Sequence, residues 1–241
     1  MRALVKNDAC IDIPALPGIS IVDLFAPGIE AQQQSEVFEQ LSVIHRRYFP
    51  ESEHVIDEWR QQLLTGIAPT NEIVHPWLVL HNGKPAGEWI VTVNLDAGVM
   101  LMLFGAVDAE VRRQYSRSWL RDFLDFLVEY CVREARALGN SLDVVMLESE
   151  KPLEQRWVAC GFELVDVNYR VPVLGMHWMK DSEIDFLDNH FAFIKKIETQ
   201  GDSSMSKCVT KAIRAFALDH YGLPEALPEV QTMLTLASAM D

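Results

Sequence analysis

The sequence has few of the features that mark secreted, metal-binding or membrane-spanning proteins. Its 241 residues include only four cysteines, with no CxxC pair: Cys10, Cys131, Cys160 and Cys208. Cysteines so far apart make neither a disulfide framework nor a zinc knuckle, so we expect reduced thiols in a cytosol. The N-terminus lacks a hydrophobic signal core. The longest apolar run, 98–107, is about half of the roughly 20 residues that a membrane helix needs, so we expect a cytoplasmic protein that does not interact with a membrane.

Several common catalytic and cofactor motifs are also missing. The chain has no phosphate-loop motif and no GxGxxG pattern. Its seven histidines form no HExxH motif and no close pair, so we expect surface or hydrogen-bonded core histidines and no metal site. The segment 201–204 (GDSS) resembles a serine nucleophile but lacks the strand–turn–helix context of such an elbow.

Positive charge is scarce. The chain has 21 Lys and Arg against 35 Asp and Glu, which gives a formal net charge of −14. This balance argues against nucleic acid and against an anionic membrane surface as partners. It mildly favours cationic or amine partners, although solubility alone explains it as well.

The hydrophobic pattern indicates strands and helices in mixed order. Alternating or continuous apolar runs predict strands, apolar residues at helical spacing predict helices, and Asn82-Gly83 predicts a hairpin turn inside 75–93. Strands are expected at 19–25, on either side of Asn82-Gly83, and at 98–107, 142–148, 162–174 and 191–197. Helices are expected at 31–49, 54–64, 112–138, 152–160, 205–221 and 226–240.

This order predicts an α/β fold with a mixed, twisted sheet and helices on both faces. We expect one domain over 1–180. The segment 181–241 is expected to be a mainly helical C-terminal extension packed on that domain, because 205–221 has a single apolar stripe (Cys208, Ala212, Ile213 and Phe216). The protein would be a monomer or a homodimer.

The order of elements over 19–180 resembles that of the GNAT acyltransferase superfamily. Two local patterns carry the resemblance. The segment 107–120, VDAEVRRQYSRSWL, is similar to the acyl-CoA loop of the family, V-x-P-x-x-R-x-x-G-x-G-x-x-L. The segment 157–171, WVACGFELVDVNYRV, is similar to its closing motif, Y-x-x-x-G-F-E followed by a strand.

The resemblance implies acetyl-CoA or another acyl-CoA as co-substrate. Orphan backbone N–H groups and the helix dipole make a helix N-terminus an anion site, which in this family receives the pyrophosphate of coenzyme A. The implied phosphate-binding residues are Arg112, Arg113, Gln114 and Arg117. The strand before them, at Phe104, Ala106 and Val107, would hold the pantetheine arm and polarise the thioester carbonyl.

The chain departs from the family pattern at two places in this loop. Tyr115 and Arg117 stand where the family usually has glycines, which let phosphate approach the backbone closely. Tyr115 either fills the place of the pyrophosphate, or Arg117 replaces lost backbone contacts with charge-assisted hydrogen bonds. Alternatively, Arg112, Arg113 and Arg117 serve only to neutralise nearby acidic side chains.

A third departure concerns proton transfer. The family tyrosine that protonates the leaving thiolate is replaced by Trp157, whose indole N–H is not a practical acid. Trp157 is therefore expected to pack or to form a wall of the substrate pocket. An acid supplied by another tyrosine, such as Tyr115 or Tyr169, stays an alternative. Glu148, at the carboxyl end of a central strand, is the candidate general base. Either Glu148 or its neighbour Glu150 alternatively caps the helix that begins at Pro152.

These residues predict an acyl-CoA-dependent N-acyltransferase, acetyl-CoA being the expected donor. Its acceptor would be a small-molecule or peptide amine that attacks directly in a ternary complex. Two alternatives remain open. One is a catalytically silent GNAT-fold module that binds a ligand or a protein, and the other is a transferase that takes its acyl group from a carrier protein.

Overall fold

The structure is a computed structural model that describes residues 10–66, 71–173, 184–187, 190–197 and 204–240. The chain divides into two compact units, each built from two separate stretches. Unit 1 comprises Met1–Thr92 and Leu103–Leu127, and unit 2 comprises Val93–Met102 and Val128–Asp241.

The first half of the chain supplies the elements of unit 1. The strands are β1 (Cys10–Asp12), β2 (Ile19–Asp23), β3 (Glu72–His81), β4 (Lys84–Asn94) and β5 (Val99–Val107). The helices are α1 (Ala31–Tyr48), the 3₁₀ turn η1 (Pro50–Ser52), α2 (His54–Thr65), the short α3 (Ala109–Arg112) and α4 (Trp119–Ala137). The strands β4 and β5 and the helix α4 continue into unit 2.

The second half supplies the other elements of unit 2. The strands are β6 (Val144–Glu150), β7 (Glu163–Val165), β8 (Val171–Pro172), β9 (Phe186–Leu187) and β10 (His190–Lys196). The helices are the 3₁₀ turn η2 (Lys151–Leu153), α5 (Glu154–Ala159), α6 (Met205–Arg214), the π-helical turn η3 (Ala215–His220) and α7 (Pro228–Ser238).

The described strands form a mixed sheet of eight, in the order β1-β2-β3-β4-β5-β6-β10-β7, and β8 and β9 pair separately. The strand β2 is antiparallel to β1 and β3, and β10 is antiparallel to β6 and β7. The strands β5 and β6 are parallel from Val99↔Val144 to Met102↔Leu147. The predicted α/β class with a mixed sheet is confirmed.

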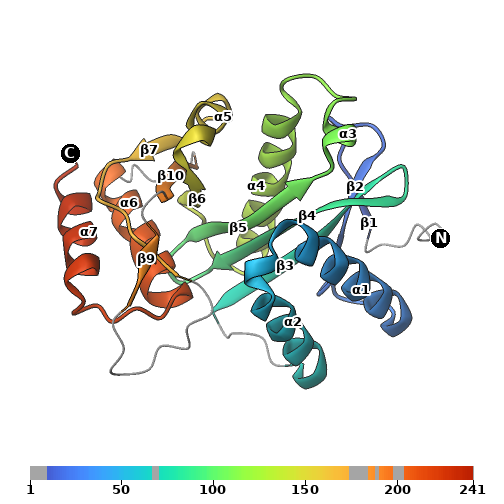
Figure 1. Cartoon of the computed structure of the whole chain (residues 1–241), viewed down its shortest axis with the longest axis horizontal. Coiled ribbons are helices and arrows are strands. Elements are labelled where there is room, and N and C mark those ends of the chain that lie inside the picture. The colour runs from blue at the N-terminus through green and yellow to red at the C-terminus, as the bar shows by residue number, and fades with distance from the viewer. Residues whose placement is uncertain (1–9, 67–70, 174–183, 188–189, 198–203, 241) are drawn as a thin grey trace. The chain divides into compact units, whose positions relative to one another are not determined.

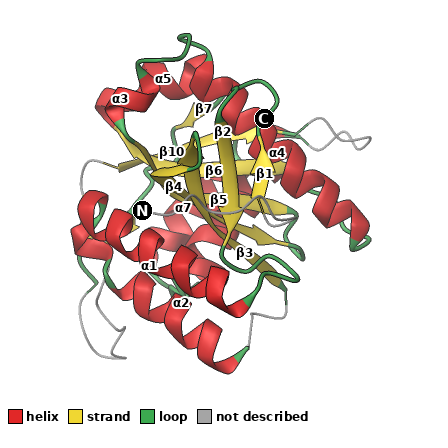
Figure 2. Ribbon diagram, turned by 90° about the vertical axis from the view of Figure 1, so that its right-hand side faces the viewer, coloured by secondary structure: helices red, strands yellow, loops and turns green. Residues whose placement is uncertain are grey.

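In unit 1, helices cover both faces of the strands. The apolar faces of α1 and α2 pack on one side, against residues such as Leu78, Leu80 and Ile90. Figures 1 and 2 show these two helices side by side across the strands. Trp89, the neighbour of Ile90, points to the other face, and its ring lies 5.3 Å from that of Phe123 at the start of α4. The alternation follows from the two-residue period of a strand, and it buries both faces.

In unit 2, the predicted apolar stripe of the 205–221 helix is buried. Cys208, Ala212, Ile213 and Phe216 are each at most 1% exposed, and α6 contacts β6, β10 and α7. In Figure 1, α6 and α7 are the orange and red helices. The expected boundary between 180 and 181 lies outside the described residues. None of the helices in the described ranges is long and apolar enough to span a membrane.

Most element predictions agree with the structure, but the long central helix begins later than expected. The sequence predicts it from 112, whereas α4 begins at Trp119. Ser116 and Ser118 lie just before it, and the hydroxyl of Ser118 donates to Asp122 Oδ2 at 2.9 Å. Serine side chains compete with helical hydrogen bonds, which favours a helix start here over a helix interior. The hairpin turn is as predicted, with positive φ at both Asn82 (52°) and Gly83 (73°).

Candidate active-site residues in the two units

The arginine-rich segment after β5 lies in unit 1 and is already hydrogen-bonded to itself. The N–H groups of Arg112, Arg113 and Gln114 donate to the carbonyls of Asp108, Ala109 and Val111 in and around α3. These three amides are therefore occupied in this conformation. The N–H of Trp119, the first residue of α4, is occupied as well, because it donates to the carbonyl of Ser116 at 3.2 Å.

The predicted phosphate-binding side chains differ in their surroundings. Arg113, Gln114 and Arg117 are exposed, whereas Arg112 is half-buried. The Nε atom of Arg112 is buried and has no hydrogen-bond partner among the described residues. A buried donor of this kind costs free energy unless it finds an acceptor, so Arg112 is the arginine of this segment best prepared to receive an anion.

Arg112 lines a small apolar cavity of about 10 Å³ together with seven other residues of unit 1: Ile19, Val79, Val107, Val111, Tyr115, Trp119 and Phe123. A cavity of this size has room for about one water molecule. In this conformation it is therefore too small to hold a ligand.

Tyr115 is directed toward the turn before β2. Its hydroxyl donates to the carbonyl of Pro17 at 2.8 Å, and its ring lies 6.1 Å from that of His81. The start of the loop is also held in place, because Asp108 accepts a hydrogen bond from Tyr48 and forms an ion pair with Arg47 at 3.2 Å. Burial and the Asp108 carboxylate raise the pKa of Tyr48. Two flanking contacts thus hold the arginine segment between them.

The predicted donor strand is β5. Its pairing with β6 ends at Met102, whereas β5 continues to Val107. Phe104 places its ring 5.1 Å from His45 and 5.0 Å from Phe49, so the side chain belongs to the core of unit 1. Ala106 is half-buried and Val107 is buried. In this region, backbone groups rather than side chains would have to hold a ligand.

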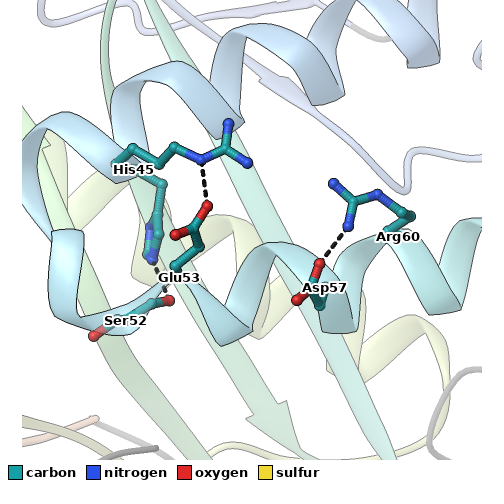
Figure 3. Close-up of polar contacts among 6 residues, drawn as sticks. His45, Ser52, Glu53, Asp57 and Arg60 are labelled. Atoms are coloured by element: carbon teal, nitrogen blue, oxygen red, sulfur yellow. Dashed lines mark hydrogen bonds and ion pairs between the residues drawn. The ribbon is translucent and has the colours of Figure 1, made fainter.

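A buried acid–base pair in unit 1 was not expected from the sequence. His45 on α1 and Glu88 on β4 are both fully buried, with Nδ1 and Oε1 2.9 Å apart. The Nε2 atom of His45 lies 3.1 Å from the carbonyl of Ser52 (Figure 3), which only accepts, so Nε2 carries a proton. Burial raises the pKa of Glu88, and its Oε2 atom has no partner among the described residues.

The candidate base Glu148 lies on β6 in unit 2. Its half-buried carboxylate accepts a hydrogen bond from Tyr169 on Oε1 and one from Tyr221 on Oε2, the second at 2.5 Å. Burial raises the pKa of Glu148 to about 7, although the two phenol donors act to lower it. Burial first, and then the neighbouring carboxylate, raise the pKa of both tyrosines well above 10. Neither phenol is therefore a ready proton donor at neutral pH.

The remaining candidates lie near Glu148 in the sequence. Glu150 is exposed and stands at the start of η2, but its side chain makes no capping hydrogen bond, so the capping role expected for it is not seen. Trp157 on α5 is half-buried, and its ring lies 6.1 Å from that of Phe162. Its indole N–H is buried without a partner in the described part of the chain.

No group of three or more His, Cys, Asp or Glu side chains among the described residues is arranged to hold a metal ion. The sequence indicated Glu148 as a candidate base, but it did not indicate Tyr169 and Tyr221 as the hydrogen-bond partners of its carboxylate. Tyr169 and Tyr221 lie 21 and 73 residues away along the chain. No local pattern signals pairs so widely separated.

No protein-family model matches the chain, and no curated protein matches its sequence. Among solved structures, it is similar to the ribosomal-protein-S18-alanine N-acetyltransferase of Escherichia coli, with 18% identity, 77% of this chain and 98% of that chain covered and a TM-score of 0.43. It is also similar to a GNAT family acetyltransferase from Elizabethkingia anophelis with acetyl-CoA bound, with 12% identity, 75% and 99% covered and a TM-score of 0.44. A third is an acetyltransferase from Streptococcus agalactiae 2603, with 12% identity, 75% and 99% covered and a TM-score of 0.44.

At such identities and TM-scores, these likenesses do not show the family, the substrate or the site of this chain.

Proposed function

We propose that the chain is an acyl-CoA-dependent N-acyltransferase that acetylates a small-molecule or peptide amine. The observation that carries the proposal is the segment from β5 to α4, where Arg112, just before the start of α4, keeps a buried Nε atom without a partner among the described residues. A cation before a helix N-terminus, and a strand that continues beyond its pairing with β6, suit a ligand with phosphates at one end and an extended arm.

In this proposal, Arg112, Arg113, Gln114 and Arg117 bind the phosphates at the first turn of α4. The backbone at Phe104, Ala106 and Val107 holds the pantetheine arm. Glu148 accepts the proton of the acceptor amine as its nitrogen attacks the thioester carbon and the carbon–sulfur bond breaks. A pKa of about 7 suits this role, because the ionised form is populated at neutral pH while the carboxylate still binds a proton well.

A thiolate is a tolerable leaving group, so transfer depends largely on positioning and needs no acid at Trp157. We place this side chain in the wall of the acceptor pocket.

Thermal unfolding with acetyl-CoA tests the proposal. Acetyl-CoA at 100 times its dissociation constant should stabilise the fold by about 2.7 kcal/mol. Arg112→Ala should weaken this effect, whereas Arg136→Ala, which removes an arginine from the last turn of α4, should not. A melting temperature that stays constant with acetyl-CoA and with longer acyl-CoAs would contradict the proposal.

One observation favours the alternative of a silent binding module. The first turn of α4 already carries the Asp122 carboxylate, which offsets the attraction of the helix N-terminus for a phosphate. Replacing this charge by Asp122→Asn separates the two functions. Acyl-CoA should bind more tightly to the variant if phosphates sit at this turn, and the change should make no difference if the module binds another ligand elsewhere.

A further inference from the structure

The carboxylate of Glu148 is held from two sides by phenols that come from different parts of unit 2. Tyr169 follows β7 and donates to Oε1, and Tyr221 follows η3 and donates to Oε2. One donor on each oxygen fixes both the direction and the rotation of the carboxylate. Both tyrosines are themselves less than 10% exposed, so surrounding packing holds them in place.

Tyr221 reaches this position through an unusual helix end. After Arg214 the helix α6 widens into the π-helical turn Ala215–His220, and the N–H of Tyr221 donates to the carbonyl of Phe216, five residues back, at 2.9 Å. The extra residue of a π-turn rotates everything after it by about 100° relative to an α-helix. The π-turn therefore sets the direction of the Tyr221 side chain.

The π-turn is anchored within unit 2. Asn94, at the end of β4, donates to Asp219 Oδ2 at 2.9 Å. The ring of Tyr221 lies 5.6 Å from that of Phe216 and 4.9 Å from that of His220. π-Turns are rare and lie often at functional sites, because a regular helix would be more stable without a reason to distort. Here the distortion coincides with a hydrogen bond to Glu148, whose pKa burial raises to about 7.

Among the described residues, β10 and two other segments place side chains against Glu148. On β10 the opposite residue is Ala192, which has no charge. Tyr169 and Tyr221 face it from the other two segments. Both are neutral donors, so they hold the carboxylate without cancelling its charge. A lysine or arginine in their place would form a lasting ion pair and would keep the carboxylate from accepting a proton.

We infer that Tyr221 is a positioning residue for Glu148 and that the C-terminal segment is thereby part of the reaction centre of this enzyme. The inference rests on the proposed function. In it, Tyr221 and Tyr169 orient the carboxylate toward the acceptor amine and set the balance between its ionised and protonated forms. The segment from α6 to α7 therefore does more than cover the sheet.

The test is the titration of Glu148, followed by its carboxyl carbon resonance in labelled protein, with Glu148→Gln to assign the signal. The hydrogen bond from Tyr221 lowers the pKa of Glu148, so Tyr221→Phe should raise the titration midpoint, by about one pH unit. Tyr169→Phe should act in the same direction. Tyr130→Phe removes a phenol hydroxyl from α4 instead and should leave the midpoint where it is.

Incorporation of 3-fluorotyrosine at position 221 keeps the shape of the side chain and makes the phenol a stronger donor. It should shift the midpoint downward, opposite to Tyr221→Phe. The inference therefore stays testable even where Tyr221→Phe perturbs the fold. A midpoint that stays constant in both proteins overturns the inference.

Activity measurements separate this inference from the proposed function. In an active enzyme, the acidic limb of the pH profile of kcat/KM should move with the titration midpoint of each variant, while the KM for acetyl-CoA stays constant. If the titration midpoint of a variant moves while the acidic limb of its kcat/KM profile stays where it is, the role of Tyr221 in the reaction is overturned. Failure of the wild type to bind acetyl-CoA refutes the proposed function, and with it the reaction-centre role, even where the midpoint still moves.

Discussion

Each of the two units holds a glutamate whose pKa burial raises, but the two carboxylates have different partners. Glu88 in unit 1 is fully buried against a histidine that can share a proton with it, inside a set of aromatic rings contributed by Phe49, Trp59 and Phe104 around His45. Glu148 in unit 2 is half-buried and faces two phenols that do not give up their protons at neutral pH.

This difference separates a structural carboxylate from one that is available for chemistry. His45 and Glu88 are both fully buried and pair with each other, so the pair joins α1 to β4 inside unit 1. The proton on Glu148 has to come from outside its cluster, because the two phenols are weak acids. Burial raises the pKa of both carboxylates, and we propose that only Glu148 takes up and releases a proton in a reaction.

Breaking the closed pair should have the largest effect. His45→Leu leaves Glu88 buried without a partner, and removal of one member of a buried pair typically costs about 3–5 kcal/mol. We expect a loss of this size in the free energy of unfolding, measured with urea. The double variant His45→Leu/Glu88→Leu should recover much of it, and a double variant no better than the single one would show that the pair is not the cause.

Removing the base should have the next largest effect. Positioned acid–base groups contribute about 100-fold or more, so Glu148→Gln should lower kcat/KM for acetyl transfer by at least about two orders of magnitude, or about 2.7 kcal/mol. Glu150→Gln, two residues further along β6 and exposed, is the matched control and should stay close to the wild type. Equal losses of kcat/KM in both variants would show that Glu148 is not the general base.

The pH dependence of stability should show an effect that is smaller per pH unit. The pKa of Glu148 is raised in the folded state, from 4.5 to about 7, so the folded protein binds a proton more tightly than the unfolded chain. Its contribution is therefore complete below about pH 4.5 and is lost as the pH rises to about 7. The difference in unfolding free energy between wild type and Glu148→Gln should fall by at most about 1.4 kcal/mol per pH unit in this window. A difference that rises with pH in this window would show that folding does not raise the pKa of Glu148.

A surface ion pair beside the closed pair should have the smallest effect. Arg46 Nε lies 2.7 Å from Glu53 Oε1, and both side chains are about half exposed, at 47% and 59%. Exposed pairs contribute roughly 0.2–1 kcal/mol. Arg46→Ala should therefore lower the free energy of unfolding by no more than this, and less at high salt. A loss comparable to that of His45→Leu would mean that the neighbourhood of η1, and not the buried pair, sets the stability of this region.

Much of the fold was predictable because it follows from local patterns. Asn82-Gly83 specifies its turn, Gly66 ends α2 with a φ of 64°, and the apolar face of α1 (Val37, Phe38, Leu41 and Ile44) is buried as its spacing requires. The start of α4 was misplaced because no proline or glycine marks a boundary in 112–118, whereas Ser116 and Ser118 precede the helix there.

The site was predictable only in part. Glu148 could be found because it lies near the carboxyl end of a buried strand, and the arginine segment could be found through its resemblance to a family loop. The partners of Glu148 could not, since Tyr221 depends on a π-turn that no apolar spacing distinguishes from an α-helix. The pairing of His45 with Glu88 depends in the same way on how α1 lies over β4, 43 residues away.

The most direct test of the account is the pH profile of acetyl-CoA-dependent amine acetylation by the wild type and by Glu148→Gln. The account predicts that kcat/KM of the wild type rises through a limb near pH 7, at the midpoint where Glu148 itself titrates, and that this limb is missing from Glu148→Gln at a rate at least about 100-fold lower. The same limb at the same rate in both proteins, or no transfer from any acyl-CoA by the wild type, would contradict it.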